Sequence, residues 1–252
     1  MHEESIRSEF TRQSDSFARV AATGFGEILD LIVGFVPADQ RASWLELACG
    51  PGAISRAIAP RVGRVQGVDL TPAMIEKARE EARAAAVGNV EFEVGDATAL
   101  EFADASFDGA VTRLSLHHIP LAQRVLEEMA RVVTPGGSVI VSDLLTDEDA
   151  EAQAWHQEIE RLRDPSHWAT PTRARLRAMG EAAGLGLESE RLVPVELDYE
   201  DWLGRGSGGE AASALIDRLL GEAPAAAESF QVSGERGARR LRFRSILLRW
   251  RR

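Results

Sequence analysis

The chain contains a single cysteine, Cys49, among its 252 residues. One thiol cannot form an internal disulfide, and it cannot supply a cysteine-cluster metal site. We expect Cys49 to be a small packed residue and not a nucleophile, because no cationic partner lies near it in the sequence. No metal site is predicted.

Positive charge is also scarce, with 29 Lys and Arg against 40 Asp and Glu and a net charge of −11. Sequence-independent nucleic-acid binding needs a basic face that neutralises phosphates, so we expect no nucleic-acid partner. The segment LRFRSILLRW at 241–250 alternates arginine with apolar residues. This alternation predicts a strand at a sheet edge, with its arginines facing solvent.

Long apolar runs are missing. The first residues, MHEESIRSEF, are acidic and contain no apolar signal core. The longest apolar run near them, ILDLIVGFV, is interrupted by Asp30 and is too short to span a bilayer. We therefore expect a cytoplasmic protein without membrane insertion.

Short apolar segments alternate with helix-like segments in the first part of the chain. Strands are predicted at 43–48, 64–70, 90–96, 107–116 and 138–145, and helices at 53–61, 71–85 and 120–133. Thr71 and Pro72 are a typical N-cap and first helical residue. The pattern predicts an α/β fold with a doubly wound, Rossmann-like sheet of seven strands, mostly parallel with an antiparallel last strand.

Three carboxylates, Glu46, Asp69 and Asp96, lie at the ends of three successive predicted strands. Singly, each is explained as a helix cap or a solvated loop acid. Together they converge at the carboxyl edge of a parallel sheet, where ligands bind in such folds. Gly50 and Gly52 form a turn after the first strand, but the third glycine of G-x-G-x-x-G and the lysine of a P-loop are missing. The set suits a cationic ligand without phosphates.

Five segments in this order, LELACGPG, GVDLTPAMIEKAR, GDATAL, FDGAVTRLSLHHI and RVVTPGGSVIVSD, resemble class I S-adenosylmethionine-dependent methyltransferases. The resemblance is greatest to the small-molecule branch around the ubiquinone and menaquinone biosynthesis methyltransferases. It implies S-adenosylmethionine as cofactor and a single methyltransferase domain over residues 1–252. Its parts would be N-terminal covering helices at 1–40, a cofactor-binding core at 41–146, and a substrate-side cap with the last strands at 147–252.

The resemblance also implies a set of cofactor contacts. Glu46 and its glycine turn would hold the methionine part, Asp69 the ribose hydroxyls and Asp96 the adenine amino group. One residue departs from the family pattern, because alanine replaces the middle glycine of the turn. The implied residues are Gln13, Phe17, Glu46, Ala48, Gly50, Gly52, Asp69, Leu70, Met74, Asp96, Ala97, Arg113, Leu114, Ser115 and His118.

Three histidines are candidates for a general base, namely His117, His118 and His167. A histidine that titrates near neutral pH can remove the proton of a hydroxyl acceptor. The alternative is that His118 only contacts the cofactor and that His167 is structural. Arg163 and Asp164 are expected to form an ion pair. Trp155, Trp168 and Trp202 are expected either to line an apolar acceptor pocket or to form the core of a cap.

The sequence therefore predicts a methyltransferase acting on a small apolar or aromatic metabolite, with O- or C-methylation favoured. One alternative is a protein of this fold that keeps the cofactor as structure and catalyses a reaction such as cyclisation. Another is methylation of RNA or protein, which the acidic composition disfavours. The expected partner is the small methyl acceptor, and pairing of two copies into a homodimer is left open.

Overall fold

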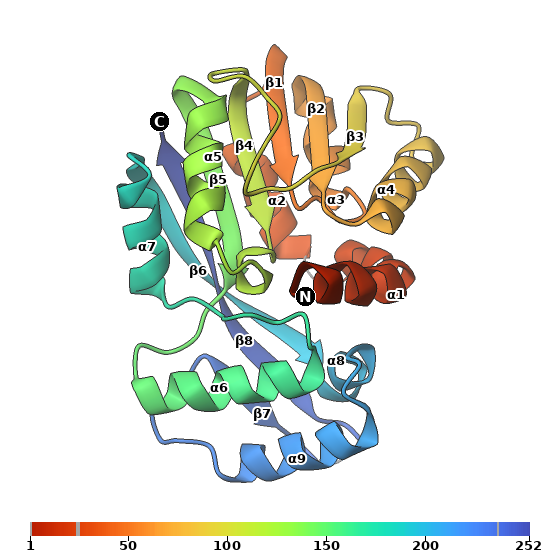
Figure 1. Cartoon of the computed structure of the whole chain (residues 1–252), viewed down its shortest axis with the longest axis vertical. Helices are drawn as coiled ribbons and strands as arrows, with labels where there is room; N and C mark the ends of the chain where they lie inside the picture. Colours follow the sequence, from red (N-terminus) through yellow and green to blue (C-terminus); the bar gives the residue numbers. More distant parts are fainter. Residues whose placement is uncertain (1, 24–25, 236) are drawn as a thin grey trace.

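The computed structural model describes residues 2–23, 26–235 and 237–252, with the side chains of residues 15–23 outside that description. Its strands form one sheet in the order β3-β2-β1-β4-β5-β8-β6, and the short β7 also pairs with β8 (Figure 1). The strands are β1 (Asp39–Leu47), β2 (Val62–Asp69), β3 (Val90–Val94), β4 (Phe107–Arg113), β5 (Val133–Leu144), β6 (Gly186–Asp198), β7 (Phe230–Ser233) and β8 (Arg240–Arg251).

The first five strands are parallel, and β8 runs antiparallel to β5, β6 and β7. The predicted doubly wound sheet with an antiparallel last strand is confirmed. The strand order reverses between β1 and β4, which places the ligand crevice of such a sheet beyond the carboxyl ends of these two strands.

Helices cover both faces of this sheet. They are α1 (His2–Thr23), α2 (Gly26–Phe35), α3 (Ala53–Ile58), α4 (Pro72–Ala84), α5 (Ala122–Val132), α6 (Ala150–Arg163), α7 (Arg173–Ala182), α8 (Tyr199–Arg205) and α9 (Gly209–Gly221). Thr71 and Pro72 occupy the predicted N-cap and first helical positions of α4. Among the described residues, none of the helices is long and apolar enough to cross a membrane.

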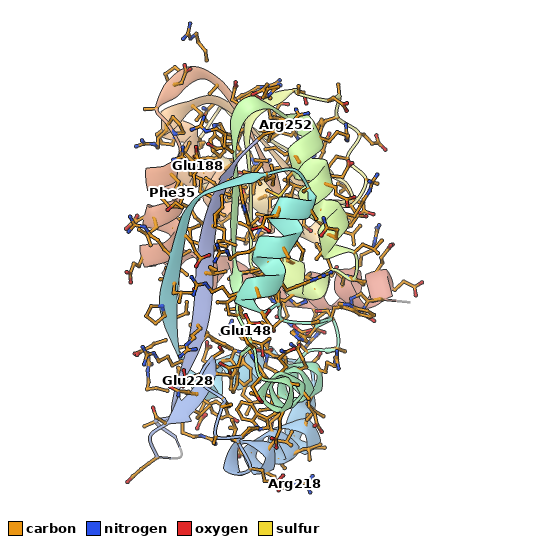
Figure 2. The ribbon with its side chains drawn as sticks, turned by 90° about the vertical axis from the view of Figure 1, so that its left-hand side faces the viewer. Phe35, Glu148, Glu188, Arg218, Glu228 and Arg252 are labelled. Carbon is orange, nitrogen blue, oxygen red and sulfur yellow. The ribbon has the colours of Figure 1, made fainter. Side chains whose placement is uncertain are left out.

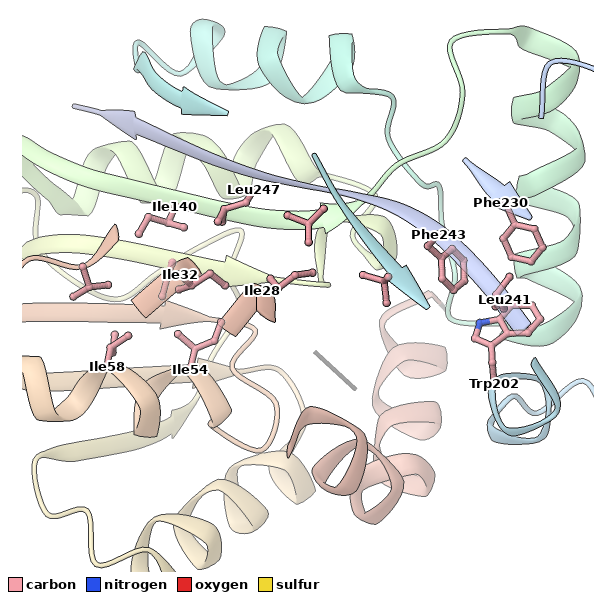
Figure 3. Packing of buried hydrophobic residues seen from close by; sticks show 14 of the residues in the cluster. Ile28, Ile32, Ile54, Ile58, Ile140, Trp202, Phe230, Leu241, Phe243 and Leu247 are labelled. Carbon is pink, nitrogen blue, oxygen red and sulfur yellow. The ribbon is translucent and has the colours of Figure 1, made fainter. Parts of the chain in front are cut away.

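Two large apolar clusters form the core. One contains α2 and α3 side chains such as Ile28 and Ile54, and the other contains α5 and α7 side chains such as Leu126 and Leu176. Because these helices follow different strands, the sheet is covered on both faces, as doubly wound connections require. Figure 3 shows part of the first cluster, which continues from the sheet to the aromatic residues Trp202, Phe230 and Phe243.

The predicted edge position of the last strand is wrong. β8 lies inside the sheet, between β5 and β6. Its arginines do face solvent at Arg240, Arg242 and Arg244, where burial alternates along the strand. From Ser245 to Leu248 every residue is buried, because helices cover both faces there. Within SILL, the three consecutive apolar residues that follow Ser245 therefore indicate an interior strand.

A cap is built on the extended antiparallel pair of β6 and β8. Both strands run from the main sheet into the lower part of the molecule, where α6, α8, α9 and β7 gather (Figures 1 and 2). Phe230 lies 5.1 Å from Phe243 and 5.5 Å from Trp202 between ring centroids. Trp155 is buried and donates to Leu219 O at 2.7 Å, so it belongs to the core of this cap. The division at 1–40, 41–146 and 147–252 stays a prediction.

A substitution at Gly109 tests the packing of the main sheet, because Gly109 lies against the Trp44 ring. A Cβ on Gly109 would lie 2.5 Å from the buried Trp44 ring. We expect Gly109→Ala to lower the free energy of unfolding by about 1–3 kcal/mol, because the interior cannot accommodate the extra methyl group. Urea denaturation measures the change.

The matched control is Gly34→Ala on α2, where an added Cβ meets no atom within 4 Å. This variant should be at least as stable as the wild type, because alanine is a better helix former than glycine and Gly34 lies in the last turn of α2. Equal stability of Gly109→Ala and the wild type would contradict the packing described here.

Candidate functional site

A cavity of about 720 Å³ lies at the carboxyl ends of the parallel strands. Its walls come from the ends of β1, β2 and β4, from the first half of α1, and from α6 and α8 of the cap. Figure 1 shows α1 crossing between the strand ends and the cap. The volume lies within the ordinary range of small-molecule sites.

Most of the residues predicted from the sequence line this one cavity. They are Gln13, Glu46, Ala48, Gly50, Asp69, Leu70, Met74, Asp96, Ala97, Arg113, Leu114, Ser115, His117 and His118. Gly52 and His167 do not line it. Phe17 lies on α1, but its side chain is outside the described part of the chain. The topology therefore collects residues from the first half of the chain at one edge of the sheet.

Glu46 is a buried carboxylate near the end of β1. Its Oε2 accepts from Ser55 N at 2.7 Å and from Ser55 Oγ at 2.5 Å. Burial raises its pKa to about 7, against the opposing effects of the Ser55 hydrogen bonds and of the Arg113 and Arg56 charges. A cation bound in the cavity would stabilise the ionised form of this carboxylate.

The turn after β1 exposes its backbone to the cavity. Ala48, Gly50 and Gly52 have φ values of 49°, 51° and 72°. A Cβ on Gly50 would meet no atom within 4 Å, so this glycine leaves open space at the cavity wall. At Gly52 a Cβ would lie 2.7 Å from the Phe92 ring. Glycine at position 50 thus leaves the cavity wall open, and glycine at position 52 lets the turn pack against the Phe92 ring.

Asp69 and Asp96 reach the same cavity from β2 and from the segment after β3. Asp69 is buried, and its two oxygens accept from Gly50 N at 2.8 Å and from Thr71 N at 2.9 Å. Burial raises its pKa despite these hydrogen bonds. Asp96 is half-buried, and its Oδ1 accepts from Thr98 N and Thr98 Oγ1 at 2.8 Å. Both carboxylates are held in place by backbone donors.

His117 forms the shortest charged contact of the site. Its Nδ1 lies 2.5 Å from Oδ1 of Asp143, which is fully buried at the end of β5. Asp143 also accepts from Leu116 N and Leu144 N at 2.8 and 2.7 Å. Burial lowers the pKa of His117, but the Asp143 carboxylate outweighs this effect, with further help from Glu160, and the net pKa is raised.

His118 and His167 have different surroundings. Nδ1 of His118 lies 3.1 Å from both the carbonyl and the hydroxyl oxygen of Ser166. Burial and the nearby His117 lower the pKa of His118 to about 4. His167 packs 5.9 Å from His117 between ring centroids, and its Nε2 contacts Gln157 Oε1 at 2.7 Å. Burial lowers the pKa of His167 to about 2, so this ring is neutral and braces the other two.

Helix α1 closes the cavity through a few specific contacts. His2 Nε2 lies 2.9 Å from His118 O, and the Phe10 ring lies 4.9 Å from the His118 ring. Glu9 accepts from Ser207 Oγ of the cap at 2.8 Å. The N-terminal helix thus joins the histidine segment to the cap and shields the space between them.

Three residues at the site, Asp143, Glu160 and Arg205, were not assigned a role from the sequence. Asp143 is the partner of His117 near the end of β5, and the rule that singled out Glu46, Asp69 and Asp96 applies to it equally. Glu160 and Arg205 line the cavity from the cap, together with Arg163 and Trp202, for which an ion pair and a pocket or cap position were expected. Arg163 does pair with Asp164, at 3.8 Å, as expected. Trp168 is 47% exposed and lies outside the cavity.

Comparison with known proteins also indicates a methyltransferase. A family described as "Methyltransferase domain" matches residues 45–137. The uncharacterized methyltransferase YcgJ of Bacillus subtilis (strain 168) is 29% identical over 197 residues, which are 78% of this chain and 78% of that protein. Its crystal structure superposes with a TM-score of 0.82 and 27% identity over 89% of this chain and 97% of that chain.

Two further relatives have named activities and match shorter regions. Demethylmenaquinone methyltransferase of Desulfitobacterium hafniense (strain Y51) is 34% identical over 43% of this chain and 45% of that protein. The 27-O-demethylrifamycin SV methyltransferase of Amycolatopsis mediterranei (strain S699) is 36% identical over 47% of this chain and 44% of that protein. Both names describe methyl transfer to small molecules.

The buried Glu46 carboxylate makes stability depend on pH. Its pKa of about 7 in the folded state exceeds its ordinary value of 4.5, so the folded chain holds this proton more tightly than the unfolded chain. The stability from Glu46 is complete below about pH 4.5 and is lost as the pH rises through 7. In urea titrations, the unfolding free energy of the wild type minus that of Glu46→Gln should fall by about 3 kcal/mol over this interval. A flat difference would contradict the assignment.

Fold, cavity and comparisons agree. The sheet has the predicted doubly wound order, the carboxylates near the ends of β1, β2 and β3 line one cavity, and both the matched family and the relative YcgJ are described as methyltransferases. The donor of the methyl group in this class is S-adenosylmethionine. The chain belongs to the class I S-adenosylmethionine-dependent methyltransferases.

Proposed function

We propose that this methyltransferase transfers a methyl group to a hydroxyl oxygen of a small, largely apolar acceptor, with His117 as the general base. The observation that carries the proposal is the buried contact of His117 with Asp143, because His117 lines the same cavity as the carboxylates Glu46 and Asp69. A base fixed by a second residue is the usual arrangement where a proton must leave the acceptor.

The residues present fit S-adenosylmethionine. The cavity offers buried carboxylates to a ligand with a positive charge and several hydroxyl donors, and the glycine turn leaves open space at Gly50. We assign Asp69 to the ribose hydroxyls, Asp96 to the adenine amino group and Glu46 to the methionine end. Leu70 and Met74 supply apolar walls beside the adenine. Arg113 sits opposite Glu46, where its charge lowers the Glu46 pKa.

The orientation of His117 suits proton removal. A carboxylate only accepts hydrogen bonds, so the Nδ1–H of His117 donates to Asp143 and the lone pair lies on Nε2. The bound cofactor supplies an electrophilic methyl group on a sulfonium sulfur. His117 Nε2 would take the proton of the acceptor hydroxyl, and the bound cofactor would supply the methyl group and remain as S-adenosylhomocysteine. Asp143 then stabilises the imidazolium.

His118 is the weaker candidate for this role. Burial and the neighbouring His117 keep its pKa near 4, which makes it a poor base at neutral pH. Nδ1 of His118 is also engaged by Ser166. We assign His118 to positioning, because its ring packs against both His117 and Phe10.

The cap side of the cavity supports an acceptor with an apolar, ring-like body. Its walls there include Leu144, Leu197, Trp202 and Phe243. Two relatives are named for methyl transfer to demethylmenaquinone and to 27-O-demethylrifamycin SV, which supports a small-molecule acceptor. The enclosure under α1 favours a small acceptor over a polymer, in agreement with the excess of acidic residues.

The ribose assignment is tested by Asp69→Ala. We expect the affinity for S-adenosylmethionine to fall at least tenfold in calorimetry, because charge-assisted hydrogen bonds to two hydroxyl groups are lost. Asp39→Ala is the control, since Asp39 is exposed at the opposite end of β1. Circular dichroism should show that both variants stay folded. An unchanged affinity in Asp69→Ala would refute the assignment.

The base assignment is tested by turnover, followed as S-adenosylhomocysteine release with a panel of hydroxylated aromatic acceptors. We expect His117→Gln to lower kcat at least a hundredfold while cofactor affinity stays within a few-fold. Asp143→Asn should lower the pKa of His117, so the acidic limb of the kcat profile should move to lower pH.

The control for this test is His167→Gln, because His167 does not line the cavity. It should reduce kcat less than His117→Gln does. Loss of turnover in His118→Gln together with normal turnover in His117→Gln would show that the base is the other histidine.

A further inference from the structure

One donor group in the acceptor half of the cavity has no hydrogen-bond partner among the described residues. Arg205 ends α8 and lines the cavity. Its Nε donates to Asp201 Oδ2 at 3.0 Å, whereas its Nη2 is shielded from solvent and no described residue hydrogen-bonds to it. A buried guanidinium N–H without an acceptor is costly, so a bound molecule that supplies one would gain affinity.

The position of Arg205 is fixed by the backbone that follows it. A Cβ on Gly206 would lie 2.4 Å from Arg163 O, and one on Gly208 would lie 2.1 Å from Leu162 O. Gly208 N also donates to Arg163 O at 3.1 Å. The segment therefore lies directly on the end of α6, and the glycines allow this approach. Arg205 is pre-positioned at the cavity wall.

The other arginine of this wall, Arg163, already has partners. Its Nη2 lies 3.2 Å from Glu160 Oε2 and 3.8 Å from Asp164 Oδ2, and its guanidinium stacks 4.7 Å above the Trp202 ring. The side chain of Asp201, the partner of Arg205, is 60% exposed, and water therefore screens the ion pair between Asp201 and Arg205. The buried edge of Arg205 is the donor that remains for a ligand.

The charges around Arg205 favour an anionic ligand. Burial lowers its pKa, and the positive charge of Arg163 lowers it further, while Asp201 and Glu160 act in the opposite direction. An anion at Nη2 would restore the hydrogen bond and compensate the buried charge at the same time. A neutral carbonyl oxygen would restore only the hydrogen bond.

We propose that Arg205 binds a carboxylate of the methyl acceptor, so that the substrates are apolar hydroxy acids. This inference rests on the proposed function, since it places the acceptor between the cap and His117. The carboxylate lies against Nη2 of Arg205, and the apolar body lies against Trp202 and Phe243. The hydroxyl group lies on the His117 side of the same cavity. Arg205 is thus the residue that selects acids over their neutral analogues.

The test uses the full chain saturated with S-adenosylhomocysteine. Benzoate, 4-hydroxybenzoate, 4-hydroxycinnamate and octanoate are titrated by calorimetry, each beside its primary carboxamide. We expect at least one acid to bind roughly tenfold or more tightly than its amide, and this preference should vanish in Arg205→Gln. Arg218→Gln is the matched control, because Arg218 is exposed on α9 of the same cap (Figure 2).

The outcomes separate this inference from the proposed function. A preference for acids that persists in Arg205→Gln, equal binding of acids and amides, or no binding of any of the four acids would overturn it. With S-adenosylmethionine in place of S-adenosylhomocysteine, methyl transfer to the hydroxylated amides at the rate of the hydroxylated acids would overturn it while leaving methyl transfer established. Acid binding that depends on Arg205, without S-adenosylhomocysteine formation in the presence of any hydroxylated probe, would support Arg205 as the anchor and count against O-methylation.

Discussion

The pairing of β8 with three other strands is the constraint on which this molecule depends. β8 joins β5 in the main sheet, continues beside β6, and reaches the cap, where it also pairs with β7. Because one strand spans both parts, the cap is placed at the carboxyl edge of the parallel strands and not at the opposite edge. The cavity exists because this placement leaves a space between strand ends and cap that α1 then covers.

The cavity separates two kinds of chemistry. Its sheet side gathers Glu46 and Asp69, whose burial raises their pKa values, so that a bound cation would stabilise their ionised forms. Its cap side gathers arginines and aromatic rings, and His117, with Asp143 as its partner, also lines the cavity. The proposed methyl transfer to oxygen would need this combination, because a cationic donor, a removable proton and an oriented acceptor must meet in an enclosed space.

Sequence reasoning succeeded where a local pattern has one structural consequence. Parallel strands that alternate with helices must end at a common edge, so the acids at their ends could be placed together from the sequence alone. It failed for the last strand, where arginine alternation suggested an edge although the run SILL marked an interior position. It also left Arg205 without a role, since Arg205 and His117 are 88 positions apart and no local pattern relates them.

The sequence by itself predicted the doubly wound fold from its periodicity, and its resemblance to a known family implied the cofactor and a set of contacting residues, because these inferences need only motifs a few residues long. Tertiary structure alone decided which histidine has a carboxylate partner, that Gly52 serves packing while Gly50 opens the cavity, and that Arg205 presents a buried donor to the acceptor side. The physical reason is that a pKa, a cavity wall and an unpaired hydrogen bond depend on neighbours in space, which here come from distant parts of the chain.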